Sequence, residues 1–409
     1  MYERMVRMRR VIFLVDMNAF FISCEITRNP ILLGKPAAVA GDPEKRAGII
    51  LAANYEARKF GVKTAMVIHE ALKLCPDMLL VPPDHNFYEQ KSKEVMALLY
   101  NYTPLVEQNS IDEAWLDMTG CEGLFGKPSE SAQRIMDNIK NELGLWCSIG
   151  ISENKFLSKM ASDMKKPLGI TELWREDIQS KLWPLPIRNT YGIGKQTAEK
   201  LQSMGIETIG NLAFFNKDLL INKLGKSGGI IHQLANGIDP SPVEPHSSDK
   251  MKSISRSVTL PEDISDIEIA KTVLMKLSDE VGMTARKFEK KGRKVHITIK
   301  YSDFQSITRQ TTIPATYLTK EISSAGIELL IKHWNRNRAV RLLGISLSGF
   351  TEDCVADQLT LFQLTETIQS EVKEEKLEKA IDAIRNKYGI SKINRAVLLK
   401  ENEKRTHKF

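Results

Sequence analysis

The feature that most constrains this chain is a short apolar strand ending in an aspartate, combined with an acidic turn far downstream. Residues 11–15 (Val-Ile-Phe-Leu-Val) are continuously apolar, and Asp16 follows them directly. Such a run predicts a buried strand that carries a carboxylate to the rim of a sheet. Residues 110–113 (Ser-Ile-Asp-Glu) predict a tight turn between two strands, with Asp112 and Glu113 at its tip.

Three carboxylates that converge at one sheet edge cannot all stay ionised unless cations neutralise them. Two Mg²⁺ ions with shared oxygen ligands are the usual solution, and such a pair serves in-line displacement at phosphorus. An aspartate at a strand end is more often a cap or a turn residue, and Asp16 and Asp112 are 96 positions apart. The metal site is therefore a hypothesis that the rest of the chain has to support.

Length and composition limit the class of protein. The 409 residues exceed what one core can hold, so we expect a few domains. The hydrophobic share of 42% and the charged share of 27% are those of an ordinary soluble protein. Five cysteines without a Cys-x-x-Cys pair argue against zinc and disulfides and favour a reducing, cytoplasmic location. No apolar stretch is long enough to span a bilayer or to form a signal peptide, so no membrane is expected.

Positive charge is concentrated in one part of the chain. Residues 250–350 contain 18 lysines and arginines against 10 acidic residues, whereas the net charge of the whole chain is only +7. A solvated surface is the common explanation of such an excess. The alternative is a domain that grips a polyanion, because neutralised phosphates release counterions.

The pattern of strands and helices divides the chain into segments. Residues 9–22 and 84–174 mix apolar strands with amphipathic helices, as in an α+β layer, and residues 23–83 form a compact insertion. Residues 175–239 are mostly helical, and residues 240–249 form a linker rich in proline and serine. Residues 250–350 have the pattern of alternating strands, and residues 351–409 form a tail with an amphipathic part around 376–388.

Two further patterns place cations where phosphates could bind. Tyr55 and Arg58 are three positions apart in a predicted helix, so one face presents a phenol and a guanidinium that can fork onto phosphate oxygens. A core tyrosine beside a surface arginine would show the same spacing. A second predicted helix opens at residues 150–155 and ends near 163–167, with lysines near both ends that could equally be ordinary surface lysines.

Five strings in order resemble the Y-family DNA polymerases, and most of all their DNA polymerase IV type, the translesion enzymes. The resemblance covers about residues 9–350. The matching strings are residues 16–21 (Asp-Met-Asn-Ala-Phe-Phe), 54–61 (Asn-Tyr-Glu-Ala-Arg-Lys-Phe-Gly), 110–113 (Ser-Ile-Asp-Glu), 150–155 (Gly-Ile-Ser-Glu-Asn-Lys) and 252–256 (Lys-Ser-Ile-Ser-Arg).

The resemblance implies an α+β multidomain fold, the right-hand polymerase. Its palm would comprise residues 9–22 and 84–174, with small fingers at 23–83. A helical thumb with a helix-hairpin-helix would follow at 175–239, and an α/β little finger at 250–350 after the linker. The tail at 351–409 would contain a clamp-binding peptide.

The resemblance also assigns catalytic roles. Asp16, Asp112 and Glu113 would hold two Mg²⁺ ions, and the Met17 carbonyl would complete the ligand set. One ion would lower the pKa of the primer 3′-hydroxyl, and the other would neutralise charge on the triphosphate.

Other residues would contact the incoming nucleotide. Tyr55, Arg58 and Lys166 would bind its β- and γ-phosphates, where negative charge develops. Phe20 and Phe21 would lie at the nucleotide; Phe21 would be the steric gate, whose ring leaves no room for a 2′-hydroxyl. Phe20 can also be read as an ordinary core residue.

Three groups of residues would contact macromolecules. Gly192 and Gly194 resemble the turn of a helix-hairpin-helix, where the backbone approaches a DNA phosphate. Residues 358–362 resemble the peptide that docks on the bacterial sliding clamp, its β subunit. The expected phosphate contacts of the basic region are Lys252, Arg256, Arg293, Lys294 and Arg341, and the expected clamp contacts are Gln358, Leu359, Leu361 and Phe362.

We therefore expect a monomeric, template-directed DNA polymerase of low fidelity that uses dNTPs and primer-template DNA and bypasses damage in DNA repair. One alternative is a nucleotide cyclase, because a carboxylate palm can also cyclise a triphosphate. The thumb turn, the basic region and the clamp peptide argue against it. The other alternative is a catalytically inactive DNA- or clamp-binding protein, against which the intact Asp16, Asp112 and Glu113 argue.

The chain departs from the family pattern at a few positions. Asn18 stands where many relatives have a second aspartate, and we expect no metal ligand to be lost. Ala52 replaces a hydroxyl residue near the triphosphate. Ile49 and Leu51 are bulky residues where the family roofs the nascent base pair, so they are expected to narrow the gap above the template base.

Overall fold

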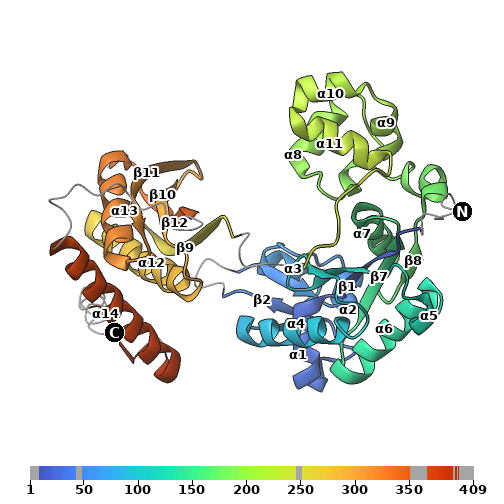
Figure 1. Ribbon diagram of the computed structural model, residues 1–409, viewed down its shortest axis with the longest axis horizontal. Helices are drawn as coiled ribbons and strands as arrows, with labels where there is room; N and C mark the ends of the chain where they lie inside the picture. Colours follow the sequence, from blue (N-terminus) through green and yellow to red (C-terminus); the bar gives the residue numbers. More distant parts are fainter. Residues whose placement is uncertain are drawn as a thin grey trace, which may run out of the picture. The chain divides into compact units, whose positions relative to one another are not determined.

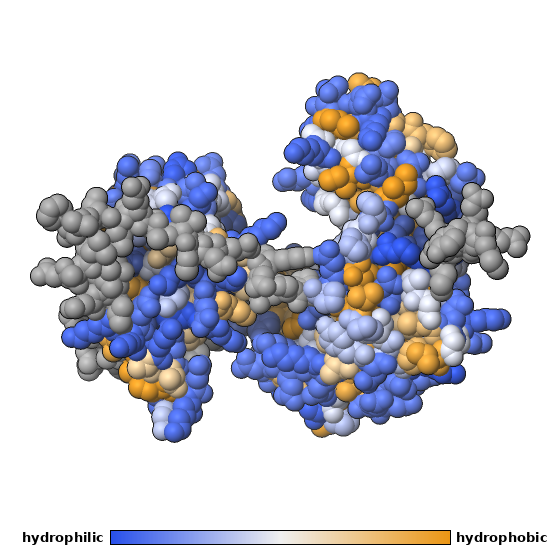
Figure 2. Space-filling view, viewed as in Figure 1, coloured by the Kyte–Doolittle hydropathy of each residue, from blue (hydrophilic) through white to orange (hydrophobic). Residues whose placement is uncertain are grey.

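The computed structural model describes residues 9–42, 48–245, 251–350, 366–389, 392, 393 and 395. The chain divides into two compact units between residues 246 and 247, within the predicted linker (Figure 1). Hydrophilic residues predominate on the face of each unit that Figure 2 shows, with scattered apolar groups between them. In the described ranges, no helix has both the length and the apolar character needed to cross a membrane.

A five-stranded sheet in the order β5-β6-β1-β7-β8 lies at the centre of the first unit. Neighbouring strands are antiparallel, except that β7 and β8 are parallel. The central strand is β1, which is buried along its whole length, as its apolar run predicts. The strands are β1 (Ile12–Met17), β5 (Val106–Gln108), β6 (Glu113–Asp117), β7 (Cys147–Ser152) and β8 (Ile170–Glu172).

Helices cover both faces of this sheet, and the two faces differ in character (Figure 1). Side chains alternate between the faces of a strand. Phe13 and Val15 of β1 therefore join the main core with α1 (Phe20–Arg28), α4 (His85–Leu99) and α6 (Pro128–Leu143). Ile12 and Leu14 point to the other face, where α7 (Lys155–Met164) packs on β7 and β1. The short helix α5 (Glu122–Phe125) precedes α6.

The insertion between α1 and α4 forms a small sheet of its own in the order β3-β2-β4. Alanines line its strands, so its two short helices pack closely on a core that contains Ala38, Ala53 and Val62. Its elements are β2 (Ala37–Ala40), β3 (Ile50–Ala53), α2 (Tyr55–Lys59), α3 (Ile68–Leu74) and β4 (Leu79–Val81).

Four helices follow the central sheet and share a core with α7. They are α8 (Lys195–Gln202), α9 (Ile209–Phe214), α10 (Lys217–Leu224) and α11 (Lys226–Ala235). The chain then returns to α7, because Asp239 accepts a hydrogen bond from the Phe156 amide at 3.0 Å. Val243 is buried against Ile12 and Leu14 of the sheet. The first half of the predicted linker is therefore packed against the first unit.

The second unit is a four-stranded antiparallel sheet in the order β11-β10-β12-β9, with two helices packed on one face. Val295, Ile297 and Ile299 alternate toward these helices, which explains the alternating pattern of this region. Its elements are β9 (Ser253–Ile264), α12 (Ile267–Lys287), β10 (Gly292–Tyr301), β11 (Ser306–Thr316), α13 (Thr319–His333) and β12 (Val340–Phe350).

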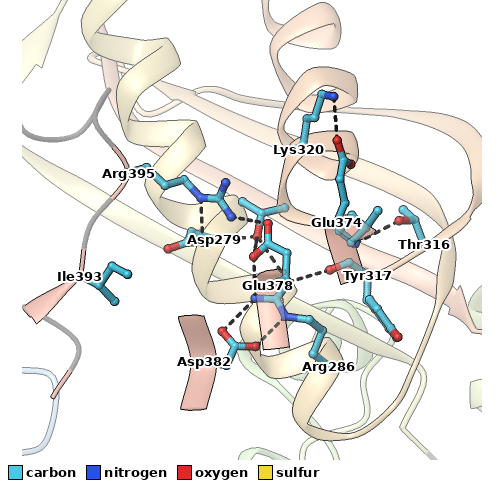
Figure 3. A network of polar contacts seen from close by, with 12 residues as sticks. Asp279, Arg286, Thr316, Tyr317, Lys320, Glu374, Glu378, Asp382, Ile393 and Arg395 are labelled. Carbon is cyan, nitrogen blue, oxygen red and sulfur yellow. Dashed lines mark hydrogen bonds and ion pairs between the residues drawn. The ribbon is translucent and has the colours of Figure 1, made fainter. Parts of the chain in front are cut away.

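A third helix, α14 (Glu366–Tyr388), packs on this unit through charged side chains (Figure 3). Arg286 of α12 donates two hydrogen bonds to Asp382, at 2.6 and 3.0 Å. Asp279, also of α12, is 2.7 Å from Arg385 and accepts a hydrogen bond from Arg395 at 3.1 Å. The tail segment is thus helical where the sequence predicts it. Its charged face is buried, however, whereas apolar residues such as Leu377 are exposed.

Candidate active site

The register of β1 and β6 brings two of the predicted metal ligands together. Asp16 pairs directly with Glu113 across the two strands. The Met17 amide donates a hydrogen bond to the Asp112 carbonyl at 2.9 Å, so the acidic turn lies at the end of β1. Asp16 follows Leu14 by two residues and Ile12 by four, so its side chain lies on the same face of the strand as theirs. This is the face that α7 covers.

Helix α7 (Lys155–Met164) and the residues after it supply two cations to this carboxylate pair. Lys159 Nζ lies 2.8 Å from Asp16 Oδ2 and 2.5 Å from Glu113 Oε1. Lys166 Nζ lies 2.7 Å from the same Asp16 oxygen and 2.7 Å from Asp163. Two ammonium groups therefore surround the buried Asp16.

These contacts shift the acidities of the site in opposite directions. Burial alone would raise the pKa of Asp16, but the hydrogen bond with Glu113 and the charges of Lys159 and Lys166 hold that pKa below its usual value. Burial and the neighbouring Asp16 raise the pKa of Glu113. Burial would lower the pKa of Lys159, but the two carboxylates outweigh it and raise that pKa.

The backbone of Asp112 lies beside the end of β1, but its side chain contacts a residue of its own turn. Its Oδ1 accepts a hydrogen bond from Ser110 Oγ at 2.6 Å. Across the described part of the chain, no three acidic, histidine or cysteine side chains form a ready-made set for a metal ion. The donor chemistry nevertheless fits divalent ions, because Asp16 and Glu113 offer paired carboxylate oxygens whose negative charge attracts cations, as the two lysines beside them show.

The predicted triphosphate residues gather beside this pair. Lys166 contacts Asp16, and the charges of Arg58, Lys166 and Asp16 all act on the Tyr55 hydroxyl. Arg58 lies over the Tyr55 ring, at 4.9 Å, and its Nε donates to the Ala53 carbonyl at 2.9 Å. Within the described ranges the buried Tyr55 hydroxyl has no hydrogen-bond partner. A buried polar atom of this kind normally has a partner, so the Tyr55 hydroxyl is suited to bind an external group such as a phosphate oxygen.

Phe20 and Phe21 are the first two residues of α1, and their side chains lie in different environments. Ala19 is in the left-handed conformation, with φ of 48°, and the helix begins directly after it. Phe20 is buried in the main core, where packing accounts for it. Phe21 is only partly buried and stacks on Tyr88 of α4, with ring centroids 4.5 Å apart and planes 14° apart.

Three buried polar residues near the site have contacts that sequence reasoning missed. Glu25 accepts a hydrogen bond from the Tyr88 hydroxyl at 2.6 Å and pairs with Arg28 at 2.8 Å. Asn18 Oδ1 accepts a hydrogen bond from the Leu168 amide at 2.9 Å, so Asn18 holds two loops together. Lys159 is one of two lysines in its helix, and no local pattern distinguishes it from Lys155.

The predicted DNA contacts lie in different environments. Gly192 has φ of 83° and Gly194 caps α8, and a Cβ at either would meet nothing within 4 Å, so this turn is open to approach. Lys252 and Lys294 are exposed. Arg256 is also exposed, but it donates a hydrogen bond to Thr284 of α12 at 3.2 Å, so it lies on the helix-covered side of its sheet.

The remaining predicted residues are placed as follows. Arg293 is half-buried, and Arg341 has its guanidinium 4.7 Å from the Phe304 ring. Ile49 is exposed and bridges to Val67. The predicted clamp residues Gln358, Leu359, Leu361 and Phe362 lie outside the described residues.

Comparison with known proteins matches three parts of the chain. Residues 15–163 match the impB/mucB/samB family, and residues 251–361 match the C-terminal domain of that family. Residues 175–206 match its helix-hairpin-helix (HHH) motif. The first match lies on the central sheet and its insertion, and the second lies on the second unit. The third covers α8 and the segment that precedes it.

Relatives are similar over nearly the whole chain. The DNA polymerase IV of Clostridium kluyveri is 64% identical, covering 97% of this chain and 100% of its own length. That of Alkaliphilus oremlandii is 59% identical, over 96% and 100%. A solved Y-family DNA polymerase chimera of Dbh and Dpo4 superimposes with a TM-score of 0.74, at 28% identity, over 84% of this chain and 100% of its own.

Proposed function

This chain belongs to the Y-family DNA polymerases, of the DNA polymerase IV type, and we propose that its site joins a deoxynucleotide to a primer with two Mg²⁺ ions held by Asp16, Asp112 and Glu113. As a member of the family it is a DNA-directed DNA polymerase, a nucleotidyltransferase of low fidelity that carries out translesion synthesis. Its substrates are primer-template DNA and dNTPs, and it depends on a divalent metal.

The observation that carries the proposed ligand set is the direct pairing of Asp16 with Glu113 beside the Asp112 turn. The Met17 carbonyl would add a neutral oxygen. When bound, the two ions would lower the pKa of the primer 3′-hydroxyl and neutralise charge on the triphosphate. Asp16 and Glu113 would orient these ions from a buried strand pair, whose backbone hydrogen bonds fix the spacing of the two carboxylates.

Tyr55, Arg58 and Lys166 would bind the β- and γ-phosphates. The unpartnered Tyr55 hydroxyl supports this role, because a phosphate oxygen would satisfy it. Lys166 would leave Asp16 for the triphosphate. Phe21 would then exclude a 2′-hydroxyl, since Tyr88 stacks on one side of its ring and keeps the ring from tilting away.

The grip on DNA would come from both units. Gly192 and Gly194 would let the backbone approach a phosphate at the start of α8. Lys252, Arg293, Lys294 and Arg341 would contact phosphates without reading sequence, which suits an enzyme that must work on any template. Arg256 would act on DNA only after giving up its contacts with α12.

A further partner is suggested by the amino-acid sequence after the second unit. The peptide at residues 358–362 would dock on a bacterial sliding clamp, with its leucine and phenylalanine side chains in an apolar pocket. The enzyme would act as a monomer in the cytoplasm.

Primer extension with Mg²⁺ and all four dNTPs tests the proposal. Asp112→Ala should lower the rate about a thousandfold or more, because several kcal/mol of metal-mediated stabilisation is lost. Binding of primer-template DNA, measured by fluorescence anisotropy, should stay nearly unchanged. Asp137→Ala, which removes an exposed carboxylate on α6, should extend primers at the wild-type rate. Normal extension by the Asp112 variant would refute the ligand set.

The same assay with a sliding clamp on the template tests the partner. Deletion of residues 358–362 should leave basal extension intact and abolish stimulation by the clamp. Stimulation that survives the deletion would place the clamp contact elsewhere.

A further inference from the structure

Lys159 lies between two side chains that the proposed mechanism assigns to metal ions. Its ammonium group contacts Asp16 Oδ2 and Glu113 Oε1 at 2.8 and 2.5 Å. Its side chain is 9% exposed, which lies between the 7% of Asp16 and the 17% of Glu113. The triphosphate contacts proposed above do not include it.

The pair of carboxylates needs a counter-charge whenever no divalent ion is present. When both carboxylates of such a pair are ionised, they repel each other across the adjacent strands, and burial strengthens the repulsion. Lys166 neutralises part of this charge, but it contacts Asp16 and Asp163 and not Glu113. Among the described residues, Lys159 is the lysine whose contacts join Asp16 to Glu113.

A divalent ion would compete for the same oxygen atoms. Carboxylate oxygens that coordinate an ion at short distance cannot also accept hydrogen bonds from an ammonium group in the same direction. Lys159 would therefore have to leave at least one carboxylate. Asp163 lies one helical turn away, 3.5 Å from Lys159 Nζ, and its side chain is 48% exposed. It offers a nearby acceptor on the same helix.

We propose that Lys159 is a positioning residue, the resident counter-cation of the metal-free site, which holds Asp16 and Glu113 side by side and moves toward Asp163 when a divalent ion binds. The inference rests on the proposed function, because it takes Asp16 and Glu113 as metal ligands. The metal affinity of the site would then depend partly on competition between the ion and the Lys159 side chain.

Binding of Mn²⁺ alone to the full-length protein, followed by electron paramagnetic resonance without DNA or nucleotide, tests the inference. Lys159→Met should bind Mn²⁺ roughly tenfold more tightly, because the ion no longer displaces a charge-assisted hydrogen bond. The melting temperature without metal should fall, since Glu113 then faces Asp16 without the ammonium group that joins them. The rise in melting temperature on adding Mn²⁺ should be larger than in the wild type.

Lys155→Met is the matched control. Lys155 lies on the same helix and pairs with Glu107 at 2.7 Å, away from Asp16 and Glu113. Its substitution should leave Mn²⁺ affinity unchanged. An unchanged or weaker affinity in Lys159→Met would overturn the inference.

Asp16→Asn separates this failure from failure of the ligand set. Lost Mn²⁺ binding in Asp16→Asn, without a gain in Lys159→Met, would refute only the role of Lys159. Retained binding in Asp16→Asn would refute the proposed ligands and the inference together.

A measurement on the wild type keeps the inference testable if Lys159→Met does not fold. Acetic anhydride labelling, read by mass spectrometry, would compare Lys159 with Lys155 as internal reference. Saturating Mn²⁺ should increase labelling of Lys159 relative to Lys155, because the ammonium group leaves its buried partners. A constant ratio would overturn the inference.

Discussion

At the scale of single residues, the ring of Phe21 is held by a chain of contacts from a neighbouring helix. Tyr88 stacks on Phe21, and its hydroxyl donates to the buried Glu25. Arg28 then neutralises Glu25 with a bidentate pair of hydrogen bonds, both at 2.8 Å. A buried carboxylate is tolerated only when its oxygens are satisfied, so these residues stabilise one another.

Tyr88→Phe should lower the free energy of unfolding by about 1–2 kcal/mol, because the buried Glu25 carboxylate loses one of its hydrogen-bond donors. Selection against ribonucleotides should persist, since the stacked ring remains. Urea unfolding and primer extension with ribonucleotides measure the two effects. Tyr102→Phe is the control, because among the described residues its hydroxyl accepts one hydrogen bond, from the neutral Asn138 amide, and its loss should matter less. Equal stability of Tyr88→Phe and wild type would contradict the account.

At the scale of elements, helix α7 determines where the cations of the site lie. Its N-terminus is capped by Asn154, whose Oδ1 accepts from the Leu157 amide at 2.9 Å. The helix lies so close to β7 that a Cβ on Gly150 would be 1.9 Å from the Ser158 carbonyl oxygen. This close approach places Lys159 over Asp16.

Gly150→Ala should therefore destabilise the protein by about 3 kcal/mol or more, because backbone on both sides has to move. Mn²⁺ affinity should change as well, since Lys159 shifts away from Asp16. Gly123→Ala in α5, where a Cβ would meet nothing within 4 Å, is the control and should be nearly neutral. Thermal unfolding checks the difference, and similar melting temperatures for the two variants would show that α7 can move easily.

At the scale of the whole molecule, each of the two units is a compact body with its own core. The second differs from the first in how its last helix is attached, because α14 is held mainly by ion pairs. Lys291 pairs with Glu375 at 2.5 Å and Lys320 with Glu374 at 3.1 Å, and both pairs are partly exposed. Exposed pairs of this kind are weakened by salt.

Raising NaCl from about 0.05 M to about 0.5 M should speed hydrogen exchange in α14, while α12 and α13 stay protected by their apolar core. Arg286→Met should have the same effect at low salt, because Asp382 then lacks its partner. Arg338→Met, which removes an ion pair with Asp303 away from α14, is the control. Exchange in α14 that is insensitive to both changes would show that apolar contacts hold it.

The sequence by itself determined the strands and turns that carry the acidic residues. The apolar run before Asp16 and the turn at residues 110–113 are local patterns, and the backbone follows them because a buried strand and a two-strand turn each have few alternatives. The glycine turn at 192–194 and the alternating strands of the second unit were predictable for the same reason. The central position of β1 between β6 and β7 was not.

Only the tertiary structure decided which side chains meet. Lys159, Glu25 and Asn18 carry no local signal, because each has a partner that is 46 to 150 positions away. The inward charged face of α14 was likewise hidden, since a periodic pattern shows that two faces exist but not which one is buried. Contacts of this kind depend on how closely whole elements pack, which is a property of the assembled core and not of any short stretch of sequence.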